Sequence, residues 1–493
     1  MRFTQIFFAL TLPLLLLCSC GGKDDTTKSK KNFRVDNLVR YTYHEQNIKI
    51  EFSTEGGDVT ASVTDNADWI ENATVTSGAT KCIIAHISEN IGSERVATIT
   101  LSAPGYANAK IKIKQNGAPT APANHTLMFY FFGTSLNRYF TTNIADAKLA
   151  IESGVLGNNN RVVYFRQSER NFGYFAELCY DKQSGKCFES IIESNIPIDV
   201  SVITPEFISN TINRLASIAP AERYGLVMAG HGTAWIERGS AGISKAGITT
   251  PLFAPAVGAE ITRHFGESNV QVNPSEIAEG ILDSDVAIDY LLFDACFMSN
   301  IETIYELRNV ANYIIASPCE IMGRGFPYER TLPYLFKDNG TATDYVGAAE
   351  SYYKYYRDEY TSTSRCGSIA VYDLSEIEAL RDATKEIVKS ARVEYNTESL
   401  QTYEGQPRHY FYDFGEWANV VATDNSALSA FNAQLDKTII AKFTLDSFYT
   451  AYGSYGTRPI NLDVYSGVTT SAPSETLNTL WKETAWYKSV WQL

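Results

Sequence analysis

Two stretches decide the fold of this 493-residue chain: Gly225-Leu226-Val227-Met228-Ala229-Gly230-His231-Gly232 and Tyr290-Leu291-Leu292-Phe293-Asp294-Ala295-Cys296-Phe297-Met298. Each begins as a short apolar run and ends in reactive side chains. A run without polar alternation is typical of a strand buried on both faces, as in a parallel sheet covered by helices. Four further runs of this kind lie at residues 127–132, 162–165, 313–316 and 368–374. Together they predict an α/β core, a mostly parallel sheet with helices on both faces.

Helix signals lie between these runs. Thr204 and Asn273 each precede a proline, an order that puts a capping side chain before the first helical position. A helix is expected over residues 299–311, directly after the second stretch, and a charged helix over residues 375–391. The dipole of the helix over 299–311 would favour a thiolate at Cys296.

Cys296 and His231 are the candidate catalytic residues. In parallel sheets, ligands bind beyond the carboxyl ends of the strands, and both side chains follow such an end. If the two strands are neighbours, the thiol and the imidazole face one cleft. Nucleophilic catalysis by cysteine needs this pair, because the imidazole activates the thiol and later protonates the leaving amine.

Each residue also has a purely structural explanation. A cysteine after a buried strand is more often a small core residue than a nucleophile, and Gly-His-Gly can be a turn. Together the signals are stronger, because His231 is the one histidine of six that glycines flank at a strand end. No Gly-x-Ser-x-Gly motif follows an apolar run, which argues against a serine hydrolase. The histidines are scattered without the spacing of metal ligands, so we expect no metal site.

The first 19 residues predict a signal peptide. Arg2 precedes an apolar run over residues 6–17, which is too short for a stable membrane span. The run ends in Leu17-Cys18-Ser19-Cys20, which resembles a lipobox, and residues 20–32 form a polar tether. We expect an exported protein that is lipid-anchored in the outer membrane through Cys20; plain secretion is the alternative. The triplet 23–25 resembles a surface-export signal of Bacteroidetes lipoproteins, or is simply part of the tether.

Residues 33–117 alternate apolar and polar side chains, as in Ile48-Lys49-Ile50-Glu51-Phe52. This period of two predicts an N-terminal all-β immunoglobulin-like sandwich. A linker over 118–125 leads to the α/β region, which we divide into a core over 126–390 and a C-terminal part over 391–493. Short segments at residues 66–69, 94–99 and 114–117 resemble the BACON domain. Because no binding site is evident in it, we prefer a spacer to a carbohydrate-binding role.

Charge and cysteine content limit the partners. The formal net charge of −14 argues against nucleic acid, which needs clustered basic side chains. Besides Cys18 and Cys20 the chain has six cysteines, too few for a disulfide framework, and their pairing stays open. We expect a monomer that acts on a protein or peptide.

The two stretches together resemble the clostripain family of cysteine peptidases, relatives of the caspases. The resemblance spans residues 126–490, with further matching blocks at 126–134, 315–320, 323–328, 465–468 and 484–487. It implies a caspase-like fold, with Cys296 as a nucleophile that forms a thioester and His231 as general acid and base. It also implies that the backbone N–H groups of Gly232 and Cys296 stabilise the oxyanion. No third catalytic residue is evident.

Specificity stays open at this stage. The resemblance implies cleavage after basic residues, because Asp294 matches the family's pocket aspartate and a carboxylate pairs with Arg or Lys. Asp294 could instead brace the strand end. The resemblance also places Arg324 beside the specificity pocket, where a cation would repel basic residues and favour acidic or neutral ones.

The resemblance carries two further expectations. Members are often zymogens, cut between the His and Cys strands, and Arg238, Lys245 and Arg263 lie in that segment. We therefore expect self-cleavage there, with residues 239–255 as an exposed loop. No cofactor is required; calcium is implied by the family alone, and no loop has EF-hand spacing. The main alternative function is a surface ligand-binding lipoprotein with an inactive peptidase fold.

Overall fold

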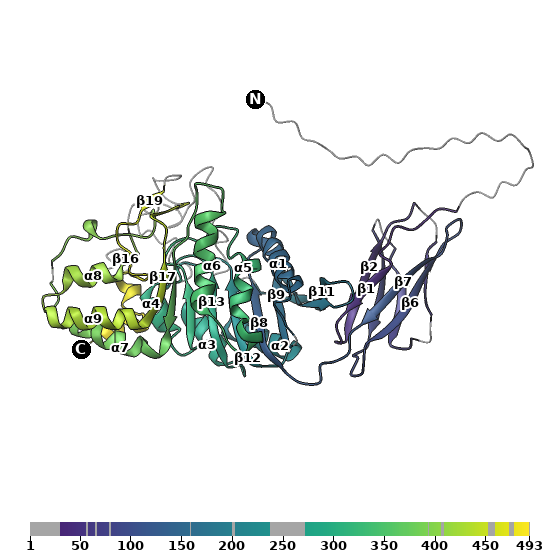
Figure 1. The fold of residues 1–493 in the computed structure, drawn as a ribbon, viewed down its shortest axis with the longest axis horizontal. Coiled ribbons are helices and arrows are strands. Elements are labelled where there is room, and N and C mark those ends of the chain that lie inside the picture. Colours follow the sequence, from purple (N-terminus) through teal and green to yellow (C-terminus); the bar gives the residue numbers. More distant parts are fainter. Residues whose placement is uncertain are drawn as a thin grey trace, which may run out of the picture.

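A computed structural model describes most of the chain, in two parts with separate apolar cores. One core lies within residues 33–113 and the other within 127–490; Figure 1 shows the smaller, N-terminal part in purple. The predicted signal peptide, Cys20 and the segment with Arg238, Lys245 and Arg263 lie outside the described residues. The described residues are 30–55, 58–64, 67–77, 80–157, 159–199, 203–236, 272–392, 394–405, 409–451, 459–472 and 478–492.

A nine-stranded mixed sheet forms the centre of the larger part (Figure 1). Its inner strands run parallel in the order β9-β8-β12-β13-β14. Strands β10 and β11 at one edge, and β15 and β17 at the other, are antiparallel to their neighbours. The strands are β8 (Ala123–Phe131), β9 (Asn160–Glu169), β10 (Phe172–Asp181), β11 (Lys186–Pro197), β12 (Ala221–Ala229), β13 (Ile288–Asp294), β14 (Tyr313–Ala316), β15 (Ile369–Asp373) and β17 (Ile439–Phe443).

All six predicted apolar runs lie in this sheet, as β8, β9, β12, β13, β14 and β15. The sequence did not single out β10, β11 and β17. Strands β11 and β17 alternate between buried and exposed positions and therefore lack a continuous apolar run. Strand β8 begins at Ala123, so His125, assigned above to the linker, is a buried strand residue whose Nε2 lies 3.3 Å from the hydroxyl of Tyr290.

Helices cover both faces of the sheet. Phe129 of β8 packs against Tyr328, whereas the next residue, Tyr130, packs on the other side against Phe165 and toward α2. Successive residues of a strand point to opposite faces, so the two helix groups lie on opposite faces. On the Phe129 face are α1 (Asn137–Glu152), α5 (Tyr328–Leu335) and α6 (Tyr345–Asp358); on the other are α2 (Pro205–Ile218) and α3 (Pro274–Leu282).

Two helix starts are as predicted, and one helix begins later than expected. Thr204 caps α2, and the N–H of Asn273 donates to a carboxylate in the first turn of α3. The helix expected over 299–311 is the shorter α4 (Ile301–Glu306), capped by Asn300. Because the chain first turns at Phe297, where φ is 62°, the helix starts well beyond Cys296. The dipole effect expected at Cys296 therefore stays a prediction.

The C-terminal region shares the core of the larger part. Trp486 is fully buried and packs against Tyr305 of α4 and Phe414 of α8. The N–H of Thr469 donates to the carbonyl of Ser299 at 3.0 Å, which fixes the chain just after Cys296. The remaining elements are α7 (Ile377–Lys389), α8 (Phe414–Val421), α9 (Asn425–Thr438), α10 (Asn478–Trp481), α11 (Ala485–Trp491), the short strands β16 (Tyr412–Asp413), β18 (Ser447–Phe448), β19 (Ile460–Asn461) and β20 (Thr469–Thr470), and the 3₁₀ turns η1 (Thr134–Leu136), η3 (Lys337–Gly340), η4 (Leu374–Glu376) and η5 (Thr397–Ser399).

The N-terminal part consists of two sheets that share one apolar core. Strand β2 shows the predicted alternation, with Ile48, Ile50 and Phe52 buried and the residues between them exposed. Strand β1 pairs with β7 in parallel, whereas the other strand pairs of this part are antiparallel. One sheet has the order β1 (Leu38–Tyr41), β7 (Ala109–Gln115), β6 (Arg95–Ser102), β3 (Thr60–Thr64), and the other β2 (Gln46–Phe52), β5 (Lys81–Ile87), β4 (Ile70–Val75).

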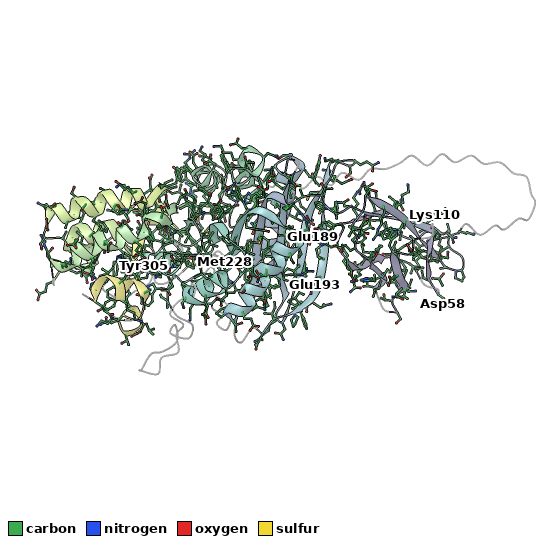
Figure 2. The ribbon with its side chains drawn as sticks, turned by 90° about the horizontal axis from the view of Figure 1, so that it is seen from below. Asp58, Lys110, Glu189, Glu193, Met228 and Tyr305 are labelled. Carbon is green, nitrogen blue, oxygen red and sulfur yellow. The ribbon has the colours of Figure 1, made fainter. Side chains whose placement is uncertain are left out.

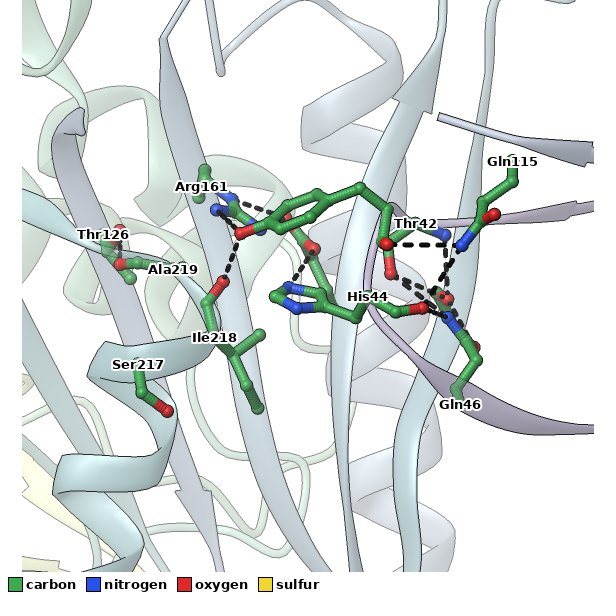
Figure 3. A network of polar contacts seen from close by, with 12 residues as sticks. Thr42, His44, Gln46, Gln115, Thr126, Arg161, Ser217, Ile218 and Ala219 are labelled. Atoms are coloured by element: carbon green, nitrogen blue, oxygen red, sulfur yellow. Dashed lines mark hydrogen bonds and ion pairs between the residues drawn. The ribbon is translucent and has the colours of Figure 1, made fainter. Parts of the chain in front are cut away.

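The N-terminal part docks against the β9–β11 edge of the large sheet (Figure 3). Tyr43 donates its hydroxyl proton to the carbonyl of Ile218 at 3.2 Å and accepts a hydrogen bond from Arg161 at 3.3 Å. Arg161 also pairs with Glu177 at 2.6 Å, and Nε2 of His44 lies 4.0 Å from the same carboxylate. A polar contact this specific fixes the orientation of the two parts.

Ion pairs extend this contact. Arg40 and Lys114 pair with Asp181 at 2.8 and 3.4 Å. Burial opposes ionisation of Asp181, but hydrogen bonds from Ser184 and the two cations outweigh it and lower the pKa of Asp181 to about 2. Each of these ion pairs joins the N-terminal part to β10, so separation of the two parts breaks both of them. The N-terminal part is therefore held by side chains as well as by the linker.

Acid is expected to release the N-terminal part. Burial lowers the pKa of His44 to about 4; the charge of Glu177 opposes this shift and that of Arg161 adds to it. The released state, with a pKa near 6.5, binds more protons than the docked state. Docking is therefore at full strength above about pH 6.5 and weakens as the pH falls toward 4. Small-angle X-ray scattering should show a larger radius of gyration near pH 4 than near pH 7.

The matched control for this prediction is His44→Gln, which keeps a polar side chain that does not titrate. This variant should keep the same dimensions over the whole interval. Asp181 does not contribute there, because its lowered pKa keeps its ion pairs intact until the pH falls below about 4. Equal dimensions of the wild-type protein near pH 7 and pH 4 would contradict the expectation.

Candidate active site

The structure brings His231 and Cys296 to neighbouring strand ends. Strands β12 and β13 are adjacent and parallel, with Ala229 directly opposite Asp294. The N–H of Gly230 donates to the carbonyl of Asp294 at 3.3 Å, so the pairing continues past the strands. The condition that the sequence left open, that these two strands are neighbours, is therefore met. Both reactive side chains therefore lie at the carboxyl edge of the sheet, where open α/β sheets bind ligands.

Gly232 allows the two segments to touch. A Cβ at this position would lie 2.3 Å from the carbonyl oxygen of Cys296 and 3.2 Å from its backbone nitrogen. The first distance is far inside van der Waals contact, so no residue with a side chain fits without movement. The glycine after His231 thus brings the backbone N–H region of one segment against that of the other.

His231 is half-buried and contacts the segment that follows β8. Its Nε2 lies 2.8 Å from the Oγ of Ser135, which belongs to the 3₁₀ turn η1. Gly133, with φ of 115°, brings this turn close to the ring: a Cβ there would lie 3.4 Å from Cδ2 of His231. Sequence reasoning missed Ser135. It could have been found by examining the residues that follow β8, because functional side chains gather at the carboxyl ends of parallel strands.

The thiol of Cys296 is completely buried in this structure. Its Sγ accepts a hydrogen bond from the N–H of Ile321 at 3.1 Å. Burial alone disfavours a thiolate, whereas a hydrogen bond to the sulfur favours it. The loop at Ile321 thus supplies a backbone donor to the sulfur.

The two candidate specificity residues lie close together. Asp294 is fully buried, and its Oδ2 accepts hydrogen bonds from the hydroxyl of Tyr328 at 2.7 Å and from the N–H of Phe326 at 3.3 Å. Arg324, two residues before Phe326, forms an ion pair with Asp146 of α1. Asp294 therefore does brace the end of β13 against α5, the structural role considered above. The positive charge of Arg324 is compensated by an aspartate that the sequence did not suggest.

The family follows from comparison with known proteins. The model of the clostripain family, Peptidase C11, matches residues 133–474. The chain belongs to the clostripain family. This is a family of cysteine proteases, and the matched region includes both His231 and Cys296. The resemblance stated from the sequence is confirmed at this level.

Solved structures support the same assignment. A secreted C11 cysteine protease from Bacteroides thetaiotaomicron is 28% identical, covers 75% of this chain and 100% of its own, and has a TM-score of 0.65. An inactive zymogen C11 protease from Parabacteroides distasonis is 26% identical, covers 76% and 99%, and has a TM-score of 0.62. By sequence, the chain is also similar to the clostripain of Hathewaya histolytica. The two are 22% identical over 244 residues, with 43% of this chain and 44% of that relative covered.

The other sequence predictions concern metals, membranes and disulfides. Among the described residues, no group of three or more His, Cys, Asp or Glu side chains is arranged to hold a metal ion. None of the described helices is long and apolar enough to cross a membrane. The six cysteines within the described ranges form no disulfide with one another.

Gly232→Ala is expected to force the two segments apart. The new methyl group cannot coexist with the carbonyl oxygen 2.3 Å away, so the Cys296 segment has to shift. Overpacking of this kind lowers the free energy of unfolding by about 1–3 kcal/mol, measurable by urea denaturation. Gly92→Ala is the control, because the nearest atom to its Cβ lies at 3.7 Å. Equal stability of the two variants would refute the close approach at Gly232.

Proposed function

We propose that this protein is a cysteine endopeptidase that uses Cys296 as nucleophile and His231 as general acid and base. The observation that carries the proposal is the contact between their two segments. They follow neighbouring parallel strands in register, and Gly232 lies against the backbone of Cys296. Family membership supplies the reaction class, peptide-bond hydrolysis through a cysteine.

The proposed reaction has two stages. In the first, His231 takes the thiol proton, and the thiolate attacks the scissile carbonyl carbon to form a C–S bond. The imidazolium then gives its proton to the leaving amine, the C–N bond breaks, and a thioester remains. In the second, His231 takes a proton from water, which attacks the thioester. A C–O bond forms, the C–S bond breaks to release the acid, and the imidazolium returns the proton to the thiolate of Cys296.

Backbone N–H groups would stabilise the oxyanion of both stages. Gly232 and Cys296 would supply them, and the close approach of their backbones supports the assignment. A donor of this kind contributes about 3 kcal/mol to transition-state stabilisation. A side chain at position 232 would displace one donor from the other.

Ser135 would orient the imidazole. A histidine that exchanges protons through one ring nitrogen needs the other nitrogen engaged, because that contact sets the tautomer and the ring angle. The 2.8 Å contact of Ser135 with Nε2 leaves Nδ1 as the nitrogen that would exchange a proton with the thiol. Ser135 is thus proposed as a positioning residue, a role that sequence reasoning did not assign to any side chain.

The buried thiol fits a precursor that needs maturation. A substrate carbonyl has to reach Sγ, yet Cys296 has no exposed surface, and its sulfur contacts the loop at Ile321. We propose that self-cleavage in the segment with Arg238, Lys245 and Arg263 allows this loop to move. That segment lies outside the described residues. A structural neighbour is itself an inactive zymogen.

For specificity we propose cleavage after basic residues. Asp294 supplies a carboxylate next to the nucleophile, and the ion pair of Arg324 with Asp146 cancels the charge that would repel Arg or Lys. The competing possibility is that Arg324 recognises an acidic residue. One observation favours it: Nη1 of Arg324 is buried without a hydrogen-bond partner among the described residues.

The proposed setting is the cell envelope. Lipidation at Cys20 would anchor the protein in the outer membrane, and the BACON-like N-terminal part would act as a spacer. Its docking through Tyr43 and His44 suits a spacer that holds the peptidase in one orientation. The alternative function is a surface ligand-binding lipoprotein with an inactive peptidase fold. Covalent labelling of Cys296 distinguishes the two.

Cys296→Ala is expected to abolish labelling by a biotinylated peptidyl acyloxymethyl ketone, because the electrophile needs the thiolate. His231→Ala should slow labelling and peptide hydrolysis by about 10⁴-fold or more, as for other nucleophile–base pairs. Cys187→Ala, at a half-buried cysteine on β11, is the matched control and should label like the wild type. The Cys296→Ala protein should also remain uncut. No labelling of the wild-type protein, even after cleavage by added trypsin, would favour the inactive-fold alternative.

The basic-residue preference predicts cleavage after Arg and Lys in a peptide library. Asp294→Asn keeps an oxygen acceptor for Tyr328 but loses the charge, so kcat/KM for Arg substrates should fall at least about tenfold. Asp146→Asn should also lower kcat/KM for Arg substrates, because the charge of Arg324 is then no longer compensated. Arg324→Met should leave cleavage after Arg intact. Cleavage after Asp with none after Arg would contradict the basic-residue preference and favour Arg324 as the residue that selects the substrate.

A further inference from the structure

A small apolar cavity lies beside His231, on the opposite face of the sheet from Asp294. Its volume is about 80 Å³, room for about five to eight water molecules or one medium-sized side chain. Met228, labelled in Figure 2, lies on its wall. No described Asp, Glu, Lys or Arg lines it. The apolar side chains that line it are Tyr130, Phe132, Met228, Val272, Ile277, Phe293 and Met298.

Strand register places this cavity across the sheet from the candidate specificity residues. Phe131, Ala229 and Asp294 are partners across β8, β12 and β13, and Asp294 points to α5. The residues next to each of them along the strands point the other way. Phe132 and Phe293 accordingly line the cavity, toward α3. One cleft edge thus has a polar side and an apolar side, with His231 on the wall of the apolar one.

A second observation indicates that the cavity is built for an occupant. The hydroxyl of Tyr130 is buried and makes no hydrogen bond to any described residue. A buried hydroxyl without a partner is unfavourable, so proteins rarely keep one unless water or a ligand reaches it. Tyr130 lines the cavity, and an occupant there can supply the missing partner.

We propose that this cavity binds the side chain of the substrate residue that follows the scissile bond, and that it selects an uncharged, mainly apolar side chain such as Leu or Met. The proposal rests on the proposed function in one respect: His231 protonates the leaving amine. The leaving part of the substrate therefore passes His231, and its first side chain meets the cavity. A charged side chain would lose its hydration there without gaining a partner.

The experiment uses internally quenched peptides that differ only in the residue after the cleaved bond: Ala, Leu, Met, Asp or Lys. The residues before the bond are the best ones from the library. The enzyme is the full chain, after self-cleavage if it occurs. We expect kcat/KM for the Leu and Met peptides to exceed that for the Ala and Asp peptides at least about tenfold, the usual gain from added methylenes in an apolar pocket.

Two substitutions at one position test the cavity itself. Ile277→Trp fills it and should shift the preference toward Ala, whereas Ile277→Ala enlarges it and should shift the preference toward larger side chains. Opposite shifts cannot come from a general loss of stability. Glu279→Ala, at an exposed position of the same helix, is the control and should keep the wild-type order.

Labelling by a peptidyl chloromethyl ketone separates this proposal from the proposed function. Chloride is its leaving group, so no residue after the bond is involved, and labelling of the wild-type protein reports Cys296 and His231 alone. Normal labelling together with the same kcat/KM for all five peptides would overturn the cavity proposal but not the proposed peptidase activity. A change of preference in the same direction in both Ile277 variants would overturn the cavity proposal as well. Absence of labelling would overturn the proposed function instead.

Discussion

The site depends on the close approach of two backbone segments at the carboxyl edge of the sheet. Gly232 and Cys296 touch because β12 and β13 are in register and because position 232 has no side chain. Every other feature of the candidate active site is placed relative to this contact. The imidazole precedes it by one residue, and the thiol and both candidate oxyanion donors belong to it. A shift of one strand would separate all of them together.

The faces of the sheet divide the chemistry. Asp294 points toward α5 and is held by Tyr328 and Phe326, while the next residues along the strands face α3 and leave an apolar cavity beside His231. A scissile bond that lies across the edge would present one neighbouring side chain to each face. Selectivity on the two sides of the bond can then be set independently, because strand periodicity keeps their walls apart.

The structure also shows where local sequence signals fail. The helix expected to polarise Cys296 starts after a turn at Phe297, and the donor to its sulfur comes instead from Ile321, in another loop. The N-terminal part is more than a tethered module, because Tyr43 and His44 reach residues of the large sheet and its surroundings. These contacts join residues more than a hundred positions apart, and no local pattern reports them.

The sequence by itself predicted the strands of the inner sheet, a separate N-terminal β part, and the position of His231 and Cys296 at strand ends. It could do so because a strand buried on both faces must be continuously apolar, and because side chains that end such strands meet at one edge. The tertiary structure alone decided the partners of these residues. Ser135 at His231, Asp146 at Arg324, Tyr328 at Asp294 and Ile321 at Cys296 come from other strands, helices and loops. Such pairs depend on how the chain returns to the site, which is a property of packing and not of spacing along the sequence.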